Sequence, residues 1–192
     1  MNLPNKLTMV RVILIPVMVA VYLVFPLISW GGYPMFLLLG LIFAAGSFTD
    51  FLDGYIARKR NLVTTFGKFM DPLADKLLVM TALLILMDSA RGIVTMWMPF
   101  WIPLFILSRE LIVTSIRLVA VGEGNIIAAS PWGKAKTFAT MGAIAIYFFL
   151  VPLGWTGFGV IGIILMSFAV GLTLISGFDY FWKNRHLIFA SK

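Results

Sequence analysis

Four of the eight acidic residues in this chain of 192 residues lie within one stretch, from Asp50 to Asp75. Asp50 and Asp53 are three positions apart, and Asp71 and Asp75 are four apart, so each pair falls on one face of a helix. The stretch joins two strongly apolar segments, and carboxylates are costly beside hydrocarbon. An acidic cluster in such a position indicates a functional site.

Carboxylates that converge without a cation repel one another and take up protons. Their oxygen atoms suit hard divalent cations such as Mg²⁺, Mn²⁺ or Ca²⁺. Two ions about 3.5–4 Å apart would fit four such ligands, an arrangement common in phosphoryl chemistry. Gly54, Ala57 and Gly67 leave room for a bulky ligand, although small residues also let membrane helices pack closely. Arg58 suits a phosphate, because its guanidinium is forked.

The chain is 61% hydrophobic and only 12% charged, far too apolar for a soluble domain of this size. We expect an all-α integral membrane protein with a single domain over residues 1–192 and no disulfides, since cysteine is absent. A short amphipathic segment at residues 1–9 precedes six expected transmembrane helices. These lie at about 10–28, 35–51, 69–87, 97–121, 132–151 and 158–178.

Basic residues predict the orientation. With six spans, the N-terminus, the second and fourth connections and the C-terminus share one side. That side holds 14 of the 15 Lys and Arg residues, and only Arg91 lies on the other. Both termini and the acidic stretch therefore face the cytoplasm by the positive-inside rule. In a membrane protein the net charge of +7 relates to orientation and anionic lipids, not to nucleic acid.

A second polar group lies in the fourth and fifth expected spans, at Arg109, Arg117, Lys134 and Lys136. Arg109 is about two turns inside its span, deeper than snorkelling readily explains. The structural alternative pairs Arg109 with Glu110 or a motif aspartate and makes the lysines ordinary anchors. The functional reading is a basic pocket for an acceptor that carries its own phosphate.

The pattern D-x2-D-G-x2-A-R-x8-G-x3-D-x3-D over residues 50–75 resembles that of the CDP-alcohol phosphatidyltransferase family at every defined position. Residues 3–11, 66–76, 108–111 and 133–137 are similar to bacterial members that form phosphatidylglycerophosphate. The resemblance implies a six-helix membrane enzyme, usually a homodimer, with two divalent cations, Mg²⁺ or Mn²⁺, at a site open to the cytoplasm.

The resemblance also implies roles for individual residues. Asp50 and Asp71 would bridge the two metals, while Asp53 would bind one of them and Asp75 the other. Asp75 would also be the catalytic general base for the acceptor hydroxyl. Six residues would bind the donor, CDP-diacylglycerol: Asn5, Thr8, Gly54, Arg58, Thr64 and Gly67. The expected reaction joins the phosphatidyl group to sn-glycerol 3-phosphate and releases CMP.

Several alternatives stay open. The acceptor of a related enzyme could be serine, inositol phosphate or, in a cardiolipin synthase, phosphatidylglycerol. The four aspartates could instead form the transport site of a divalent-cation transporter. Such a site should lie near the midplane with a path to both faces, whereas these aspartates fall at cytoplasmic helix ends. A non-enzymatic membrane scaffold gives no reason for their spacing.

Overall fold

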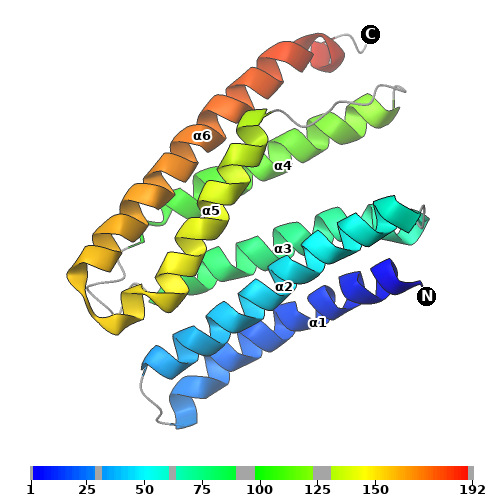
Figure 1. The fold of residues 1–192 in the computed structure, drawn as a ribbon. Coiled ribbons are helices and arrows are strands. Elements are labelled where there is room, and N and C mark those ends of the chain that lie inside the picture. Colours follow the sequence, from blue (N-terminus) through cyan, green and yellow to red (C-terminus); the bar gives the residue numbers. More distant parts are fainter. Residues whose placement is uncertain (1, 29–31, 61–63, 90–97, 123–130, 190–192) are drawn as a thin grey trace.

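The computed structural model describes residues 2–28, 32–60, 64–89, 98–122 and 131–189. Within these ranges the chain forms six α-helices, two 3-10 turns (Phe25–Ile28 and Val151–Leu153) and no strand. The predicted all-α fold is thereby confirmed. The helices, labelled in Figure 1, are α1 (Leu3–Val24), α2 (Gly32–Arg60), α3 (Thr65–Ser89), α4 (Trp101–Gly122), α5 (Pro131–Phe149) and α6 (Thr156–Phe189).

The N-terminal segment differs from the expectation. It is the beginning of α1, which starts at Leu3 and continues to Val24 without a break. Pro4 lies in the first turn, where a helix needs no backbone N–H from it. Residues near the N-terminus are therefore carried on a rigid helix that packs against the rest of the bundle.

Four helical stretches are long and apolar enough to cross a membrane: Leu3–Leu27, Gly32–Ile56, Trp132–Leu153 and Thr156–Lys183. They correspond to the first, second, fifth and sixth expected spans, so the chain is a multi-pass membrane protein. α3 and α4 are also long, and they carry Asp71 and Asp75 and Arg109 and Arg117 respectively, together with further charged residues. That they cross the membrane as well stays a prediction. Trp97, where the fourth span was expected to begin, lies outside the described residues.

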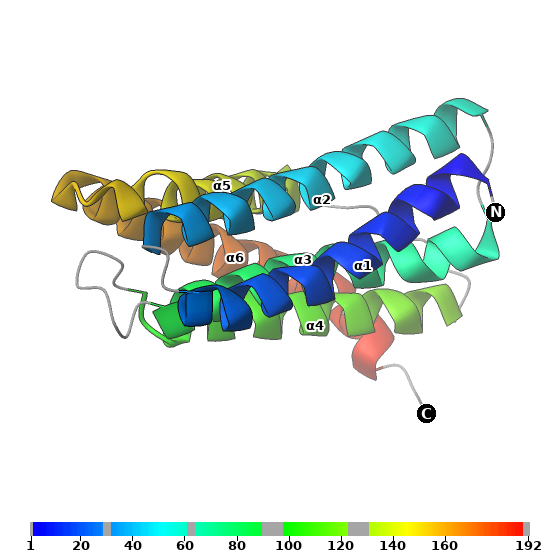
Figure 2. The ribbon, with the colours of Figure 1, turned by 90° about the horizontal axis from the view of Figure 1, so that it is seen from below.

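The helix ends nearest the charged residues lie together at one end of the bundle. The start of α1, the end of α2 and the start of α3 meet at one end of the bundle, where α4 and α6 also end and α5 begins (Figures 1 and 2). We call this the site end, because the motif aspartates and the basic residues lie toward it. The arrangement brings sequence segments more than 100 residues apart to the same side of the molecule.

Close approaches between helices hold the core together. All six helices contribute buried apolar side chains, one from each being Met18, Leu39, Leu78, Ile106, Ile144 and Met166. At Gly40 of α2, a Cβ atom would lie 2.7 Å from the ring of Phe149 and 3.0 Å from Cβ of Phe148. Small residues at such crossings let backbones approach, which drives helix association in membranes.

We therefore expect Gly40→Leu to destabilise the bundle, since overpacking typically costs about 1–3 kcal/mol or more. Gly142→Leu is the matched control, because position 142 of α5 is exposed and its added Cβ would have no neighbour within 4 Å. Thermal unfolding of the purified proteins in detergent is the measurement. Equal unfolding temperatures for the two variants would contradict the tight α2–α5 crossing.

Candidate functional site

The motif aspartates lie on two helices near the site end. Asp50 and Asp53 belong to α2, which continues through the motif to Arg60, and Asp71 and Asp75 belong to the first turns of α3. The Asp53 side chain is 3% exposed and that of Asp50 is 38% exposed. The other two aspartates are half-buried. The site thus combines a buried carboxylate with three that are more accessible.

Arg11 of α1 contacts both aspartates of α2, and its side chain is fully buried. Its Nη1 lies 2.9 Å from Oδ1 of Asp50, and its Nη2 donates to Oδ2 of Asp53 at 2.6 Å. Nε donates to the Gly46 carbonyl at 3.2 Å. Sequence analysis counted Arg11 only as a positive charge. The signal it missed was a lone arginine at the beginning of an apolar run, where a charge needs a partner.

α1 also contacts the α3 part of the motif. Thr8 Oγ1 donates to Oδ1 of Asp71 at 2.5 Å. Thr64 donates to Oδ1 of Asn5 at 2.8 Å and accepts the backbone N–H of Gly67 at 3.0 Å. The second of these bonds satisfies one of the open N–H groups at the start of α3, as a helix cap does. Four of the six residues expected to bind the donor are therefore gathered in one place.

The remaining donor-site predictions are placed less fully. Gly54 follows Asp53 on α2 and is half-buried. The Arg58 backbone is helical, but its side chain lies outside the described residues. At Gly67, a Cβ atom would lie 3.3 Å from oxygen atoms of Asn5 and Thr64, so a side chain there would crowd this cluster.

The aspartates fit divalent cations by the chemistry of their oxygen donors. Among the described residues, however, no three acidic, histidine or cysteine side chains lie close enough together to hold one ion. Arg11 and Thr8 instead contact oxygen atoms of three of the four carboxylates. The helices bring the two predicted pairs to the same end of the bundle, with side chains of α1 between them.

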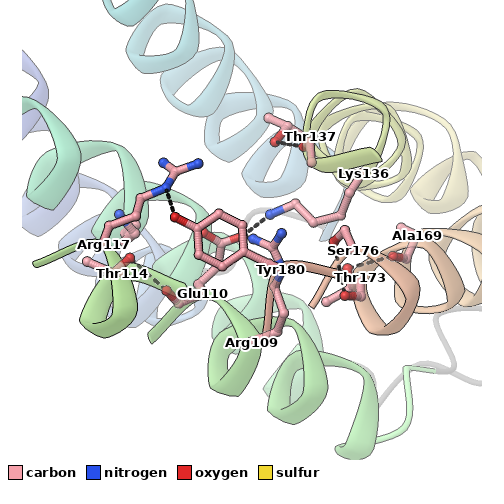
Figure 3. Close-up of polar contacts among 12 residues, drawn as sticks. Arg109, Glu110, Thr114, Arg117, Lys136, Thr137, Ala169, Thr173, Ser176 and Tyr180 are labelled. Carbon is pink, nitrogen blue, oxygen red and sulfur yellow. Dashed lines mark hydrogen bonds and ion pairs between the residues drawn. The ribbon is translucent and has the colours of Figure 1, made fainter. Parts of the chain in front are cut away.

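A basic pocket of about 400 Å³ lies beside the aspartates, between α3, α4, α5 and α6. All four predicted acceptor-site residues line it, together with Asp75 on its α3 wall. The basic residues are Arg109, Arg117, Lys134 and Lys136, joined by Lys76. Figure 3 shows three of them directed toward a common region from α4 and α5. The structure therefore brings the two polar groups of the sequence into contact at Asp75.

Glu110 links two of these cations across two helices. Its Oε1 forms ion pairs with Lys136 of α5 and, at 3.4 Å, with neighbouring Arg109 (Figure 3). The pairing of Arg109 with Glu110, raised as the structural alternative, is therefore present. Arg109 still has a buried Nε atom without a hydrogen-bond partner.

Arg117 is held from a helix that sequence analysis did not connect to the pocket. Its Nε donates to the Tyr180 hydroxyl at 3.2 Å, and its guanidinium lies 5.5 Å from the centre of that ring (Figure 3). Tyr180 of α6 is 3% exposed and packs with Val113 and Ile116. Sequence analysis did not single out Tyr180, and nothing in its local sequence signals this contact.

An apolar cavity of about 290 Å³ adjoins the basic pocket between α3, α4 and α5. The two share Asp75, Lys76, Glu110, Lys136 and Thr137 as lining residues. Beyond that polar rim the cavity is lined by side chains such as Leu77, Met80, Leu107 and Met141. Asp75 thus stands where a polar compartment meets an apolar one, as a site for an amphiphile requires.

Comparisons with known proteins agree with this geometry. A family model described as CDP-alcohol phosphatidyltransferase matches residues 1–175. A CDP-diacylglycerol–glycerol-3-phosphate 3-phosphatidyltransferase of Bacillus subtilis is 43% identical over 192 residues, covering 95% of each chain. One of the same name from Rickettsia bellii is 38% identical, covering 94% of this chain and 93% of its own. A probable phosphatidylglycerophosphate synthase of Mycobacterium tuberculosis is 39% identical, covering 93% and 79% respectively.

The shared ion pair of Glu110 predicts a stability effect. Glu110→Gln leaves Lys136 and Arg109 close together without their carboxylate, which should cost about 1–3 kcal/mol. Asp179→Asn is the control, because its ion pair with Lys183 lies on an exposed helix face and is worth under about 1 kcal/mol. Thermal unfolding of both variants decides the matter. A Glu110→Gln protein as stable as the control would show that this ion pair does not hold α4 and α5 together.

Proposed function

This chain belongs to the CDP-alcohol phosphatidyltransferase family, and on that premise we propose that it transfers the phosphatidyl group from CDP-diacylglycerol to sn-glycerol 3-phosphate. The products are phosphatidylglycerophosphate and CMP. The names of the relatives from Bacillus subtilis and Rickettsia bellii support this reaction. The observation that carries the acceptor assignment is the basic pocket with Asp75 in its wall.

The acceptor phosphate binds between α4 and α5, against Arg109, Arg117, Lys134 and Lys136. Charge-assisted hydrogen bonds to phosphate are strong and directional, and arginine forms them in pairs. The bond from Arg117 Nε to Tyr180 leaves the terminal nitrogens of that exposed guanidinium to face a ligand. An acceptor without a phosphate, such as serine, would make no use of this concentration of positive charge.

Asp75 accepts the proton of the acceptor's 1-hydroxyl group. The oxygen then forms a bond to the phosphorus that bears diacylglycerol, and the bond from that phosphorus to CMP breaks. CMP leaves with the electron pair of that bond. Because both cavities meet at Asp75, the hydroxyl and the lipid phosphate are brought together beside it, and such positioning supplies much of the rate.

Asp50, Asp53, Asp71 and Asp75 would hold two divalent cations, Mg²⁺ or Mn²⁺, since their carboxylate oxygens are the donors that such ions prefer. The family generally uses divalent metals. When bound, such ions neutralise the charge of the pyrophosphate and of the departing CMP. Support for this assignment is the donor chemistry of the four carboxylates and their common position at the site end.

The CDP part of the donor lies against Asn5, Thr8, Gly54, Arg58, Thr64 and Gly67. Four of these residues form the hydrogen-bonded cluster where α1 meets α3, which supports a common role for them. The apolar cavity between α3, α4 and α5 accommodates part of an acyl chain. Its mouth is polar and its interior apolar, which matches the change of polarity along the lipid.

The site end faces the cytoplasm, with both termini, and the protein is a homodimer in the cell membrane. The orientation rests on the distribution of basic residues, and the dimer on the family resemblance. The aspartates lie in the halves of α2 and α3 that are nearer the site end. That position supports a catalytic pocket open to one side over a transport site with access from both.

Related enzymes differ in the acceptor that they use, so the decisive assay compares acceptors. It measures the release of CMP from CDP-diacylglycerol in the presence of Mg²⁺ or Mn²⁺. Purified protein is given sn-glycerol 3-phosphate, serine or inositol phosphate in turn. We expect release with sn-glycerol 3-phosphate alone. Equal release with serine would overturn the acceptor assignment, and no release with any acceptor would overturn the enzymatic function.

Asp75→Asn should reduce turnover by at least about a hundredfold while largely sparing donor binding, because the amide cannot take the proton. Asp88→Asn is the matched control, since Asp88 lies at the opposite end of α3, and its contact with the Tyr22 hydroxyl survives an amide. Steady-state turnover and CDP-diacylglycerol binding are measured together. Near-normal turnover in Asp75→Asn would exclude this residue as the base.

Arg117→Gln and Lys134→Gln should each raise the KM for sn-glycerol 3-phosphate by about tenfold or more, because each removes a charged donor to the phosphate. The KM for CDP-diacylglycerol should stay near its normal value. Lys183→Gln, at an exposed position on α6, serves as the control for loss of charge alone. If Arg117→Gln and Lys134→Gln both retain the normal KM for sn-glycerol 3-phosphate, as the control does, the acceptor phosphate binds elsewhere.

A further inference from the structure

Arg11 makes the most extensive polar contacts of any buried charge in the described part of the chain. Its side chain is 0% exposed, and every residue after it in α1 up to Ala20 is uncharged and mostly apolar. A charge in such surroundings is costly unless its hydrogen-bonding groups are engaged. Here Nε and Nη2 donate hydrogen bonds to oxygen atoms of α2 at 3.2 and 2.6 Å, and Nη1 forms an ion pair with Oδ1 of Asp50 at 2.9 Å without a hydrogen bond.

The three contacts fall on one face of α2. Gly46, Asp50 and Asp53 are separated by four and three positions, so they follow one another along that face over two helical turns. A planar guanidinium with fixed donor directions can satisfy this set in only one orientation. Arg11 therefore determines both where α2 lies against α1 and how the two aspartate side chains are turned.

At the position of Gly46, α2 also packs closely against α3. A Cβ atom at Gly46 would lie 2.7 Å from the Leu78 side chain, so these two helices are already in close contact there. On α1, Thr8 lies three residues before Arg11, on the same face, and contacts Asp71 of α3. One face of α1 thus contacts aspartates on both helices of the motif.

We propose that Arg11 is a positioning residue that holds Asp50 and Asp53 in one arrangement, whether or not divalent cations are bound. The guanidinium engages one oxygen atom of each carboxylate, and a carboxylate has two. The two carboxylates are then already oriented to bind cations between turnovers. Cation binding therefore requires no large movement of α2. This inference rests on the metal site of the proposed function.

Two roles for Arg11 predict opposite effects on cation binding. A positive charge that merely lies near the aspartates repels a divalent cation, so weakening its contact with them should strengthen cation binding. A positioning residue orients the ligands, and loss of such outer contacts typically weakens metal binding by about 10–100-fold. Arg11→Lys separates the two roles, because lysine keeps the charge but lacks the fork that spans both carboxylates.

The test measures Mn²⁺ binding to the purified full-length protein in detergent, without substrates, from the electron paramagnetic resonance signal of unbound Mn²⁺. We expect Arg11→Lys to weaken binding by about tenfold or more. Lys6→Gln, which removes an exposed charge from the same helix, should leave the affinity unchanged. Unchanged or tighter binding by folded Arg11→Lys would overturn the positioning role.

A variant that unfolds in EDTA is assayed by the Mn²⁺ concentration that restores its thermal unfolding transition. If that Mn²⁺ concentration is about tenfold above the one the wild type needs, the positioning role is supported, and an equal concentration contradicts it.

The variant Asp71→Asn distinguishes failure of this inference from failure of the proposed function. If the wild type binds no Mn²⁺, both fail. If the wild type binds Mn²⁺ and Asp71→Asn weakens it while Arg11→Lys does not, only the role of Arg11 fails.

Discussion

The contacts of Arg11 with Asp50 and Asp53 join α1 to α2 around a guanidinium that is fully buried, although Asp50 itself is 38% exposed. Removing both aspartates would leave the buried guanidinium without a counterion, which is among the costliest changes a core can undergo. The position of α1 follows from this requirement. Because Thr8 and Asn5 lie on the same helix, they are carried to Asp71 and Thr64 at the start of α3.

The same requirement organises the other half of the bundle. Glu110 lies between Lys136 and Arg109, so that α4 and α5 share their charges instead of repelling each other. Tyr180 then connects Arg117 to α6. Acidic residues are thereby concentrated where α1, α2 and α3 meet and basic residues where α4, α5 and α6 meet, with Asp75 at the boundary. Such a division suits a reaction that joins two phosphorylated molecules, one anchored in lipid and one soluble.

Much of this could be predicted from the sequence. The apolar runs predict the six helices, and the spacing of the aspartates places both pairs at one end. The partners of Arg11, Glu110 and Tyr180 on other helices could not be predicted, because helical periodicity does not tell which helices are neighbours. Arg11 and Asp53 are 42 residues apart, and Arg117 and Tyr180 are 63 apart. The N-terminal residues looked like a separate segment because their polarity differs, although they continue α1.

The central claim is that the aspartates of α2 and α3 form a divalent-cation site beside the basic pocket. Anomalous X-ray diffraction from crystals of the protein grown with Mn²⁺ tests this claim most directly, because it locates the ions without reference to activity. We predict two Mn²⁺ peaks in contact with Asp50, Asp53, Asp71 and Asp75. Absence of Mn²⁺ from these side chains, with occupied sites elsewhere on the protein, would contradict it.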